Sequence, residues 1–262
     1  MLGAIIGDIC GSVYEWNPYK TEFPDRVPLI NETARFTDDS VLSVATAEAI
    51  LLQQDYAAAY QKWGLRYPNA GYGGTFYHWM FNESLEPYNS WGNGSAMRIS
   101  PVGWTFETLE ETLAEAKRSA EVTHNHPEGI KGAQSVAAAI FMARNGADKR
   151  EIKQYIESTF DYDLDRSTQD IWPVYFFDVS CQGSVPESII SFLESRDYEH
   201  AIKIAISLGG DSDTMACIAG GIAEAFYGDI PQPLVDFAEQ KLNGELLDII
   251  NQFTYMVKRK KK

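Results

Sequence analysis

The chain has 262 residues, enough for one large domain or two small ones. Hydrophobic residues make up 45% of it and charged residues 23%, which is ordinary for a soluble globular protein, and no stretch approaches the roughly 18 consecutive apolar residues of a membrane span. The formal net charge of −15 argues against a large contact with the phosphate backbone of nucleic acid. We therefore expect neither a membrane nor a nucleic acid as a partner.

Cysteine usage and the start of the chain indicate the compartment. The three cysteines, Cys10, Cys181 and Cys217, lie far apart and form no CxxC pair. The apolar start of the chain lacks a basic segment and ends early at Asp8, so we do not interpret it as a signal peptide. Buried, reduced thiols in a cytoplasmic protein are the simplest interpretation. We expect a monomer.

Helical patterns dominate the chain. Ala-rich segments with apolar residues at every third or fourth position predict helices over residues 39–54, 109–121, 132–144, 149–158, 186–194, 198–207, 213–227, 231–241 and 244–257. Strand signals are few, and residues 172–179 are the best short candidate. The fold class expected for residues 1–257 is therefore all-α, a compact single-domain helical bundle, and residues 258–262 form a basic tail.

The segments that break the helical pattern are where we expect chemistry, because functional residues concentrate on loops held by a rigid scaffold. These segments are residues 7–15, 16–36, 88–97, 123–129 and 208–211. The sequence contains no nucleophile elbow, and no Ser or Cys has an evident His partner nearby. Covalent catalysis is therefore not expected.

Two acidic clusters at opposite ends of the chain are its most informative feature, because each opens an apolar, helix-like segment. Each combines two carboxylates with a threonine hydroxyl: Thr37, Asp38 and Asp39 in the first, and Asp211, Asp213 and Thr214 in the second. One Asp is enough to cap a helix, so paired carboxylates are more than capping needs. Brought face to face, the clusters offer hard oxygen ligands that suit Mg²⁺, Mn²⁺ or Ca²⁺ rather than zinc. Without a cation the carboxylates would repel and some would protonate.

Three weaker motifs each allow a structural interpretation. Residues 7–15 have Gly at both ends of a small turn and finish at Glu15, so a closely packed helix with a solvated Glu is the simpler interpretation. The Gly/Asn loop over residues 91–98 can bring backbone N–H groups close to a phosphate, although Asn-Gly is usually only a turn. His124 and His126 lack the further ligands of a metal site, which leaves ligand contact or hydrogen bonding within the loop.

Taken together, these segments resemble the ADP-ribosylglycohydrolase family. Five stretches carry the resemblance, and they follow the family's order over nearly the whole chain: GDICGSVYE (7–15), FTDDS (36–40), WGNGSAMRISPVG (91–103), THNHPEGIKGA (123–133) and LGGDSDTMACIAGGIAEAFYG (208–228). Each stretch is only moderately specific. Five of them in register make chance agreement improbable.

The resemblance implies a compact all-α fold with two Mg²⁺ or Mn²⁺ ions in a cleft. The metal ligands it implies are the six residues of the two acidic clusters: Thr37, Asp38, Asp39, Asp211, Asp213 and Thr214. The catalytic residues would be Glu15, on a mobile loop beside the metals, together with Asp38 and Asp39. The residues that would line the ADP-ribose cleft are Asn93, Gly94, Ser95, Ala96, Met97 and His124.

The implied reaction is hydrolysis of the glycosidic bond between ADP-ribose and an acceptor, with an ADP-ribosylated protein as the expected partner. Such a bond breaks through an oxocarbenium-like state, in which carboxylates can position water and move protons. Two metals can also hold the ribose diol and a water together. Which of Glu15, Asp38 and Asp39 moves the proton stays open.

The acceptor also stays open. Arginine is favoured, but serine, O-acetyl-ADP-ribose, a nucleobase or a small molecule could each be the group released. The loop over residues 16–36, which should face the substrate, has no pattern that selects among them. Two other functions compete with this one. The chain could be a metal-dependent hydrolase of another nucleoside or phosphorylated substrate on the same fold, or a catalytically weak ADP-ribose-binding relative.

Overall fold

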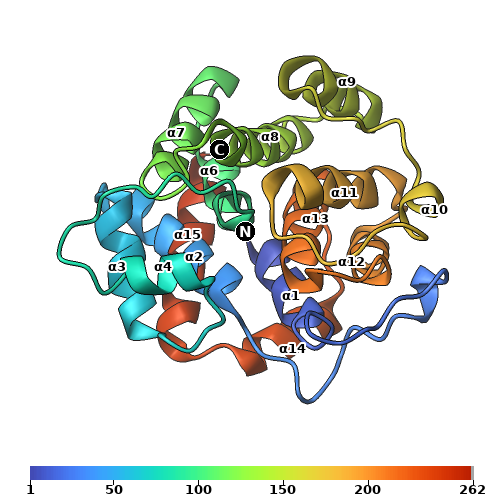
Figure 1. Cartoon of the computed structure of the whole chain (residues 1–262), viewed down its shortest axis with the longest axis horizontal. Coiled ribbons are helices and arrows are strands. Elements are labelled where there is room, and N and C mark those ends of the chain that lie inside the picture. Colours follow the sequence, from blue (N-terminus) through green and yellow to red (C-terminus); the bar gives the residue numbers. More distant parts are fainter. Residues whose placement is uncertain (261–262) are drawn as a thin grey trace.

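The computed structural model describes residues 1–260, and this part of the chain is helical with no sheet (Figure 1). In chain order the elements are α1 (Leu2–Gly11), η1 (Pro24–Arg26), α2 (Asp38–Leu52), α3 (Tyr56–Arg66), α4 (Gly74–Trp79), α5 (Gly94–Met97), α6 (Ser100–Thr105), α7 (Leu109–Glu121), α8 (Pro127–Arg144), α9 (Lys149–Phe160), α10 (Thr168–Ile171), α11 (Cys181–Glu194), α12 (Tyr198–Ser207), α13 (Ser212–Tyr227), α14 (Gln232–Lys241) and α15 (Gly244–Lys260). The expected all-α fold class is confirmed.

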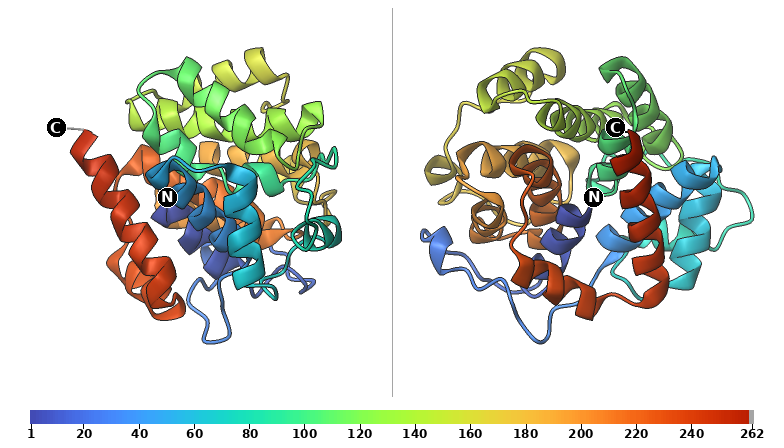
Figure 2. Two further views of the ribbon diagram at one scale, coloured as in Figure 1. Left: turned by 90° about the vertical axis from the view of Figure 1, so that its left-hand side faces the viewer. Right: turned by 180° about the vertical axis from the view of Figure 1, so that it is seen from behind.

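The helices pack around a central pair, α1 and α13, which come from opposite ends of the chain (Figure 1). Almost every residue of both helices is buried, because both consist mainly of apolar and small residues. Helices α8, α11 and α12 pack against α13, and α2 packs against α1. In Figure 2, α15 lies along the outside of the molecule, where it contacts α2. The starts of α2 and α13 therefore meet near the centre of the fold.

Close packing between α1 and α13 depends on glycine. Gly3, Gly7 and Gly11 recur every fourth residue and face α13. A Cβ atom on Gly7 would lie 2.1 Å from the carbonyl oxygen of Ala216, and one on Gly11 would lie 2.5 Å from the Cα of Asp213. Only glycine permits such an approach of two backbones. The contact fixes α1 against the first turn of α13, where the second acidic cluster begins.

We expect Gly7→Ala to lower the free energy of unfolding by about 1–3 kcal/mol, the usual cost of overpacking a core. The added methyl group would meet the backbone of Ala216, which cannot turn aside as a flexible side chain would. Gly244→Ala is the control, because nothing lies within 4 Å of a Cβ at that position and it starts a helix. Urea denaturation of both variants measures the effect. Equal stability of the two variants would contradict the packing argument.

Several helix bounds match their sequence patterns. Residues 109–121 and 198–207 are predicted as helices, and α7 and α12 have those bounds. Helices α8 and α11 begin earlier than predicted, at Pro127 and Cys181, because the side chains of His126 and Ser180 cap the additional turns. The sequence does not predict α3, although Tyr56, Tyr60 and Trp63 have helical spacing and lie in the core.

Two segments outside the predicted helices have different outcomes. The closely packed helix, the simpler interpretation of residues 7–15, is confirmed for residues 7–11, which are the last turns of α1 and pack against α13 through Gly7 and Gly11. Residues 172–179, the best strand candidate, form no strand. Within residues 1–260 they have no neighbouring strand to pair with, and only one isolated bridge, between Gly92 and Ser180, lies nearby. A backbone hydrogen bond from Asn93 to Val179 (2.8 Å) accompanies that bridge.

The end of the chain is helical as far as it is described. Helix α15 continues to Lys260, so the basic residues 258–260 extend the helix, whereas the sequence predicts a tail from residue 258. Lys261 and Lys262, the rest of that predicted tail, lie outside the described residues. No helix within residues 1–260 is both long enough and apolar enough to cross a membrane.

Candidate active site

The first acidic cluster is held in place by a carboxylate from another helix. Thr37 caps α2, accepting a hydrogen bond from the backbone N–H of Asp39. Asp8 on α1 accepts hydrogen bonds from the backbone N–H (2.9 Å) and the hydroxyl (2.7 Å) of Thr37. It also accepts from the backbone N–H (3.1 Å) and the hydroxyl of Ser40. Asp8 thereby satisfies free donors at the helix start and neutralises part of its positive dipole.

Sequence reasoning did not include Asp8 among the site residues. A signal was available, because Asp8 is the only charged residue in an otherwise apolar and small α1. A fully buried carboxylate is rare unless it has partners, so a lone Asp in such a helix indicates a specific role. Its partners, however, lie on a different helix and could not be named from the sequence.

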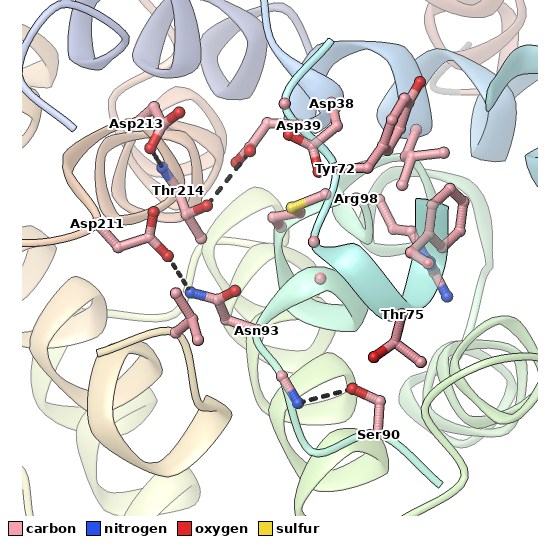
Figure 3. Close-up of a pocket in the computed structure, with 18 of the residues that line it drawn as sticks. Asp38, Asp39, Tyr72, Thr75, Ser90, Asn93, Arg98, Asp211, Asp213 and Thr214 are labelled. Carbon is pink, nitrogen blue, oxygen red and sulfur yellow. Dashed lines mark hydrogen bonds between the residues drawn. The ribbon is translucent and has the colours of Figure 1, made fainter. Parts of the chain in front are cut away.

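The second cluster opens α13 and is joined to the first. Asp211 precedes the helix and accepts a hydrogen bond from the side-chain amide of Asn93 (2.6 Å), while Asp213 accepts from the backbone N–H of Thr214 (2.9 Å). The hydroxyl of Thr214 donates to Asp39 (3.3 Å), which links the starts of α2 and α13 (Figure 3). The two clusters therefore face each other, as the sequence predicts.

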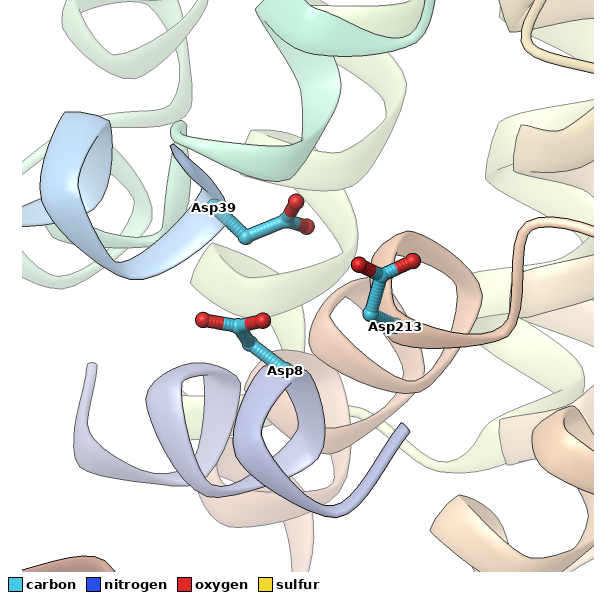
Figure 4. Close-up of side chains that lie close together, drawn as sticks. All are labelled: Asp8, Asp39 and Asp213. Carbon is cyan, nitrogen blue, oxygen red and sulfur yellow. The ribbon is translucent and has the colours of Figure 1, made fainter. Parts of the chain in front are cut away.

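Two groups of three carboxylates lie at this meeting point, and in each group one oxygen atom from every member lies within 4.8 Å of the others. The first contains Asp8, Asp39 and Asp213, which come from α1, α2 and α13 and lie side by side in Figure 4. The second contains Glu15, Asp211 and Asp213. Asp213 belongs to both groups. Asp39 Oδ1 is buried and has no hydrogen-bond partner among the described residues.

Such a cluster fits a divalent cation. Removal from water disfavours carboxylate charges, and neighbouring carboxylates disfavour them further. Burial raises the pKa of Asp38, Asp39 and Asp213 well above the ordinary value, and repulsion by nearby acids adds to the effect. The donors are all oxygen atoms, the type that Mg²⁺, Mn²⁺ and Ca²⁺ prefer. A cation would remove the repulsion and supply a partner for Asp39 Oδ1.

Glu15 differs from the other acids because it is only half-buried. It follows α1 in a turn and borders the cleft. Burial raises its pKa to about 7, and repulsion from Asp211 contributes after burial. A carboxyl group with a pKa near neutrality can both donate and accept a proton at physiological pH. Glu15 therefore has the protonation behaviour of a general acid or base.

A cleft of about 470 Å³ opens above the carboxylates. Its walls come from the acidic clusters, from a Gly-rich segment over residues 71–76 and from the Gly/Asn loop over residues 92–98 (Figure 3). Trp16 and Phe177 also line it. Sequence reasoning did not include the 71–76 segment, although its repeated glycines are a signal for close backbone approach to a ligand. Asp38 borders this cleft, but its carboxylate belongs to neither close group.

The predicted cleft residues divide into two sets. Asn93, Gly94 and Met97 line the cleft, and so does His124. Ser95 and Ala96 are buried and are not among the described residues that line the cleft. The hydroxyl of Ser95 donates to the carbonyl of Gly129 (2.7 Å), which ties the loop to the start of α8.

His124 lines the cleft as a neutral ring. Burial lowers its pKa well below the ordinary value, and the positive charge of Arg98 lowers it further. One ring nitrogen, Nδ1, is within 2.7 Å of the Thr123 hydroxyl. The other, Nε2, would lie 3.1 Å from a Cβ at position 94, so Gly94 keeps it accessible. His126 instead caps α8 through its own Nδ1 and does not line the cleft.

A family model described as ADP-ribosylglycohydrolase matches residues 1–260. The chain belongs to the ADP-ribosylglycohydrolase family. As a member of this family it is an enzyme, a hydrolase of the ADP-ribosyl class. The resemblance carried by the five sequence stretches is therefore confirmed.

Individual relatives of this ADP-ribosylglycohydrolase are distant. ADP-ribosylhydrolase ARH3 of Gallus gallus is 26% identical over 89% of this chain and 85% of the relative. ADP-ribosylarginine hydrolase Tri1 of Pseudomonas putida is 26% identical over 95% of this chain and 76% of the relative. A solved structure described as an ADP-ribosylglycohydrolase-related protein complex superposes with a TM-score of 0.75 at 22% identity, covering 98% of this chain and 95% of the other. That structure supports the fold.

Proposed function

We propose that this protein is a metal-dependent hydrolase that cleaves the glycosidic bond between ADP-ribose and an acceptor, with arginine as the favoured acceptor. The observation that carries the proposal is the pair of carboxylate groups that share Asp213 at the base of the cleft. The Tri1 relative is described as an ADP-ribosylarginine hydrolase, which supports arginine as the acceptor.

The residues that would hold two Mg²⁺ or Mn²⁺ ions are Thr37, Asp38, Asp39, Asp211, Asp213 and Thr214. Of these, Asp39, Asp211 and Asp213 belong to the close carboxylate groups, and Glu15 is a further member of the second group. Asp8 lies in the same group of carboxylates as Asp39 and Asp213, but its oxygens already accept hydrogen bonds from the start of α2. We assign it the role of holding that helix start in position. Bound metal ions would neutralise the carboxylates and lower the pKa of a bound water.

The chain's own residues would act on the substrate as follows. Water adds to the anomeric carbon of the ribose, the bond from that carbon to the acceptor breaks, and the acceptor leaves with a proton. Asp38, on a rigid helix start, would orient the water and accept its proton. Glu15, which borders the cleft, would donate the proton that the departing acceptor takes with it. Asn93 and His124 would orient the ADP-ribose, since both line the cleft.

The decisive test is a release assay with defined linkages, run with and without Mg²⁺. We expect free ADP-ribose from an arginine-linked peptide only when the metal is present. Serine-linked peptide, O-acetyl-ADP-ribose and an ADP-ribosylated nucleobase are the comparison substrates. Cleavage of another nucleoside or phosphorylated substrate alone would favour the second hydrolase hypothesis. Tight binding of ADP-ribose without any release would identify a binding protein.

A further inference from the structure

Two loops lie together at the mouth of the cleft and are anchored beside Asp211. The first follows Glu15, and the second covers residues 174–179. The Lys20 ammonium donates to the carbonyl of Tyr175 (2.5 Å), which ties one loop to the other. A Cβ atom on Gly210 would lie 2.9 Å from the Tyr175 ring. The second loop is therefore packed on the backbone just before the second acidic cluster.

The two loops also meet through a pair of aromatic rings. The indole of Trp16 stacks on the ring of Phe177 with a centroid separation of 5.2 Å and an interplanar angle of 29°. Both side chains line the cleft, as do Glu15 and Asp213. Trp16 is nevertheless 76% exposed and Phe177 39% exposed. One face of the indole is therefore covered by Phe177, while most of the side chain remains open to a ligand.

Core packing does not account for this pair, because a ring that stays three-quarters exposed gains little from burial. Large exposed aromatic rings at a binding cleft are typical of contact surfaces for ligands. The ring faces carry partial negative charge and attract planar cations. The cleft mouth therefore favours a flat, positively charged group.

We propose that Trp16 and Phe177 form the acceptor subsite of the cleft, and that this subsite takes the planar guanidinium of an ADP-ribosylated arginine. The inference rests on the proposed hydrolase function and names the residues that select its substrate. A guanidinium matches both features of the subsite, since it is flat and always charged and stacks readily on aromatic faces. A serine side chain or an acetyl ester has neither a π face nor a charge. A nucleobase is flat but neutral.

The experiment compares four variants on arginine-linked and serine-linked ADP-ribosyl peptides at saturating Mg²⁺. Trp16→Ala and Phe177→Leu remove the rings, and Trp16→Phe keeps an aromatic face. Phe176→Ala is the matched control, because Phe176 is 77% exposed on the same segment and does not line the cleft. We expect Trp16→Ala to raise KM for the arginine-linked peptide about 10-fold, and Trp16→Phe to restore most of the loss. The Kd of ADP-ribose should not change.

Several results would overturn the proposal. Equal losses of activity on arginine-linked and serine-linked peptides would show that the Trp16–Phe177 pair only supports the loop that carries Glu15. A weaker affinity for ADP-ribose in Trp16→Ala would place the ring on the ADP-ribose side. An ADP-ribosylated nucleobase that is cleaved better than the arginine-linked peptide, and that depends on Trp16, would assign the subsite to a neutral acceptor.

A binding measurement separates failure of this inference from failure of the proposed function. If the protein releases ADP-ribose from no linkage, the hydrolase proposal fails, but the subsite can still be tested with methylguanidine in the presence of ADP-ribose and Mg²⁺. We expect methylguanidine to bind the wild-type protein and to bind Trp16→Ala about 10-fold more weakly. Equal binding to both proteins would overturn the subsite even if hydrolysis is observed.

Discussion

Removal of divalent metal with EDTA is expected to abolish hydrolysis and to lower the melting temperature at pH 8, and added Mg²⁺ or Mn²⁺ should restore both. A ligand that binds only the folded state stabilises it by about 2.7 kcal/mol at 100 times its Kd. Asp213→Asn should remove much of this gain, because Asp213 belongs to both carboxylate groups. Calorimetric scans with and without metal measure the gain in melting temperature. The control is Asp229→Asn, which changes an exposed residue elsewhere in the protein.

The metal effect should also depend on pH. In the metal-free protein, burial raises the pKa of Glu15 to about 7 and that of Asp213 well above its ordinary value, so the folded state holds extra protons. The protonated forms of these groups stabilise the folded state. This stabilisation is complete below a pH of about 4, which is the pKa of such groups in the unfolded chain, and it is lost as pH rises through their higher pKa values in the folded protein. The gain in melting temperature from Mg²⁺ should therefore grow from pH 5 to pH 8.

Two results would contradict the metal centre. The first is full activity in a chelated, metal-free sample. The second is a melting temperature that responds to Mg²⁺ equally in the wild-type protein and in Asp213→Asn. Either result would leave the buried carboxylates without a cation and would require protonation to explain their close approach.

Glu15→Gln is expected to reduce kcat by about 100-fold or more, the scale on which a positioned acid or base contributes. The amide keeps the shape and hydrogen bonding of the side chain but cannot transfer a proton. The Kd of ADP-ribose should change much less than kcat. Both quantities are measured at one saturating Mg²⁺ concentration, because loss of metal would mimic either effect. Glu32→Gln, at an exposed position in the same connection between α1 and α2, is the control.

Asp38→Ala provides the companion measurement. Asp38 starts α2, but Thr37 makes the capping hydrogen bond, so the helix should still form. We expect a similar loss of kcat with an unfolding transition close to that of the wild type. Normal turnover in Glu15→Gln would show that Glu15 is only a structural end of its turn. Normal turnover in Asp38→Ala would remove Asp38 from the catalytic residues.

Local patterns in the sequence predict much of this fold. Helices with a cap and a regular apolar spacing, such as α7 and α12, have the predicted bounds. The strand predicted over residues 172–179 is wrong because aromatic and β-branched residues there resemble a strand pattern, while Phe177 and Val179 in fact line the cleft. A strand also needs a partner, and no local pattern reveals whether one exists.

Some residues of the candidate site can likewise be recognised in the sequence, and others cannot. Thr37, Asp38 and Asp39 and the cluster at Asp211 are visible in the sequence, because acids gather at two predicted helix starts. The lone charge of Asp8 in an apolar helix is visible in the sequence, but its partners are not, because they lie at the start of another helix, 29 and 32 residues away in the chain. The Trp16–Phe177 pair is likewise formed by two loops that only the tertiary fold brings together.

The glycine contact between α1 and α13 also governs when the site forms. A ribosome makes α1 and the start of α2 well before α13, so a nascent chain carries Asp8, Asp38 and Asp39 long before Asp213 exists. Until both helices dock, the carboxylates remain in water with ordinary affinities for protons and metals. A chain that stops before α13 therefore lacks one half of the carboxylate cluster and cannot bring the two acidic clusters together.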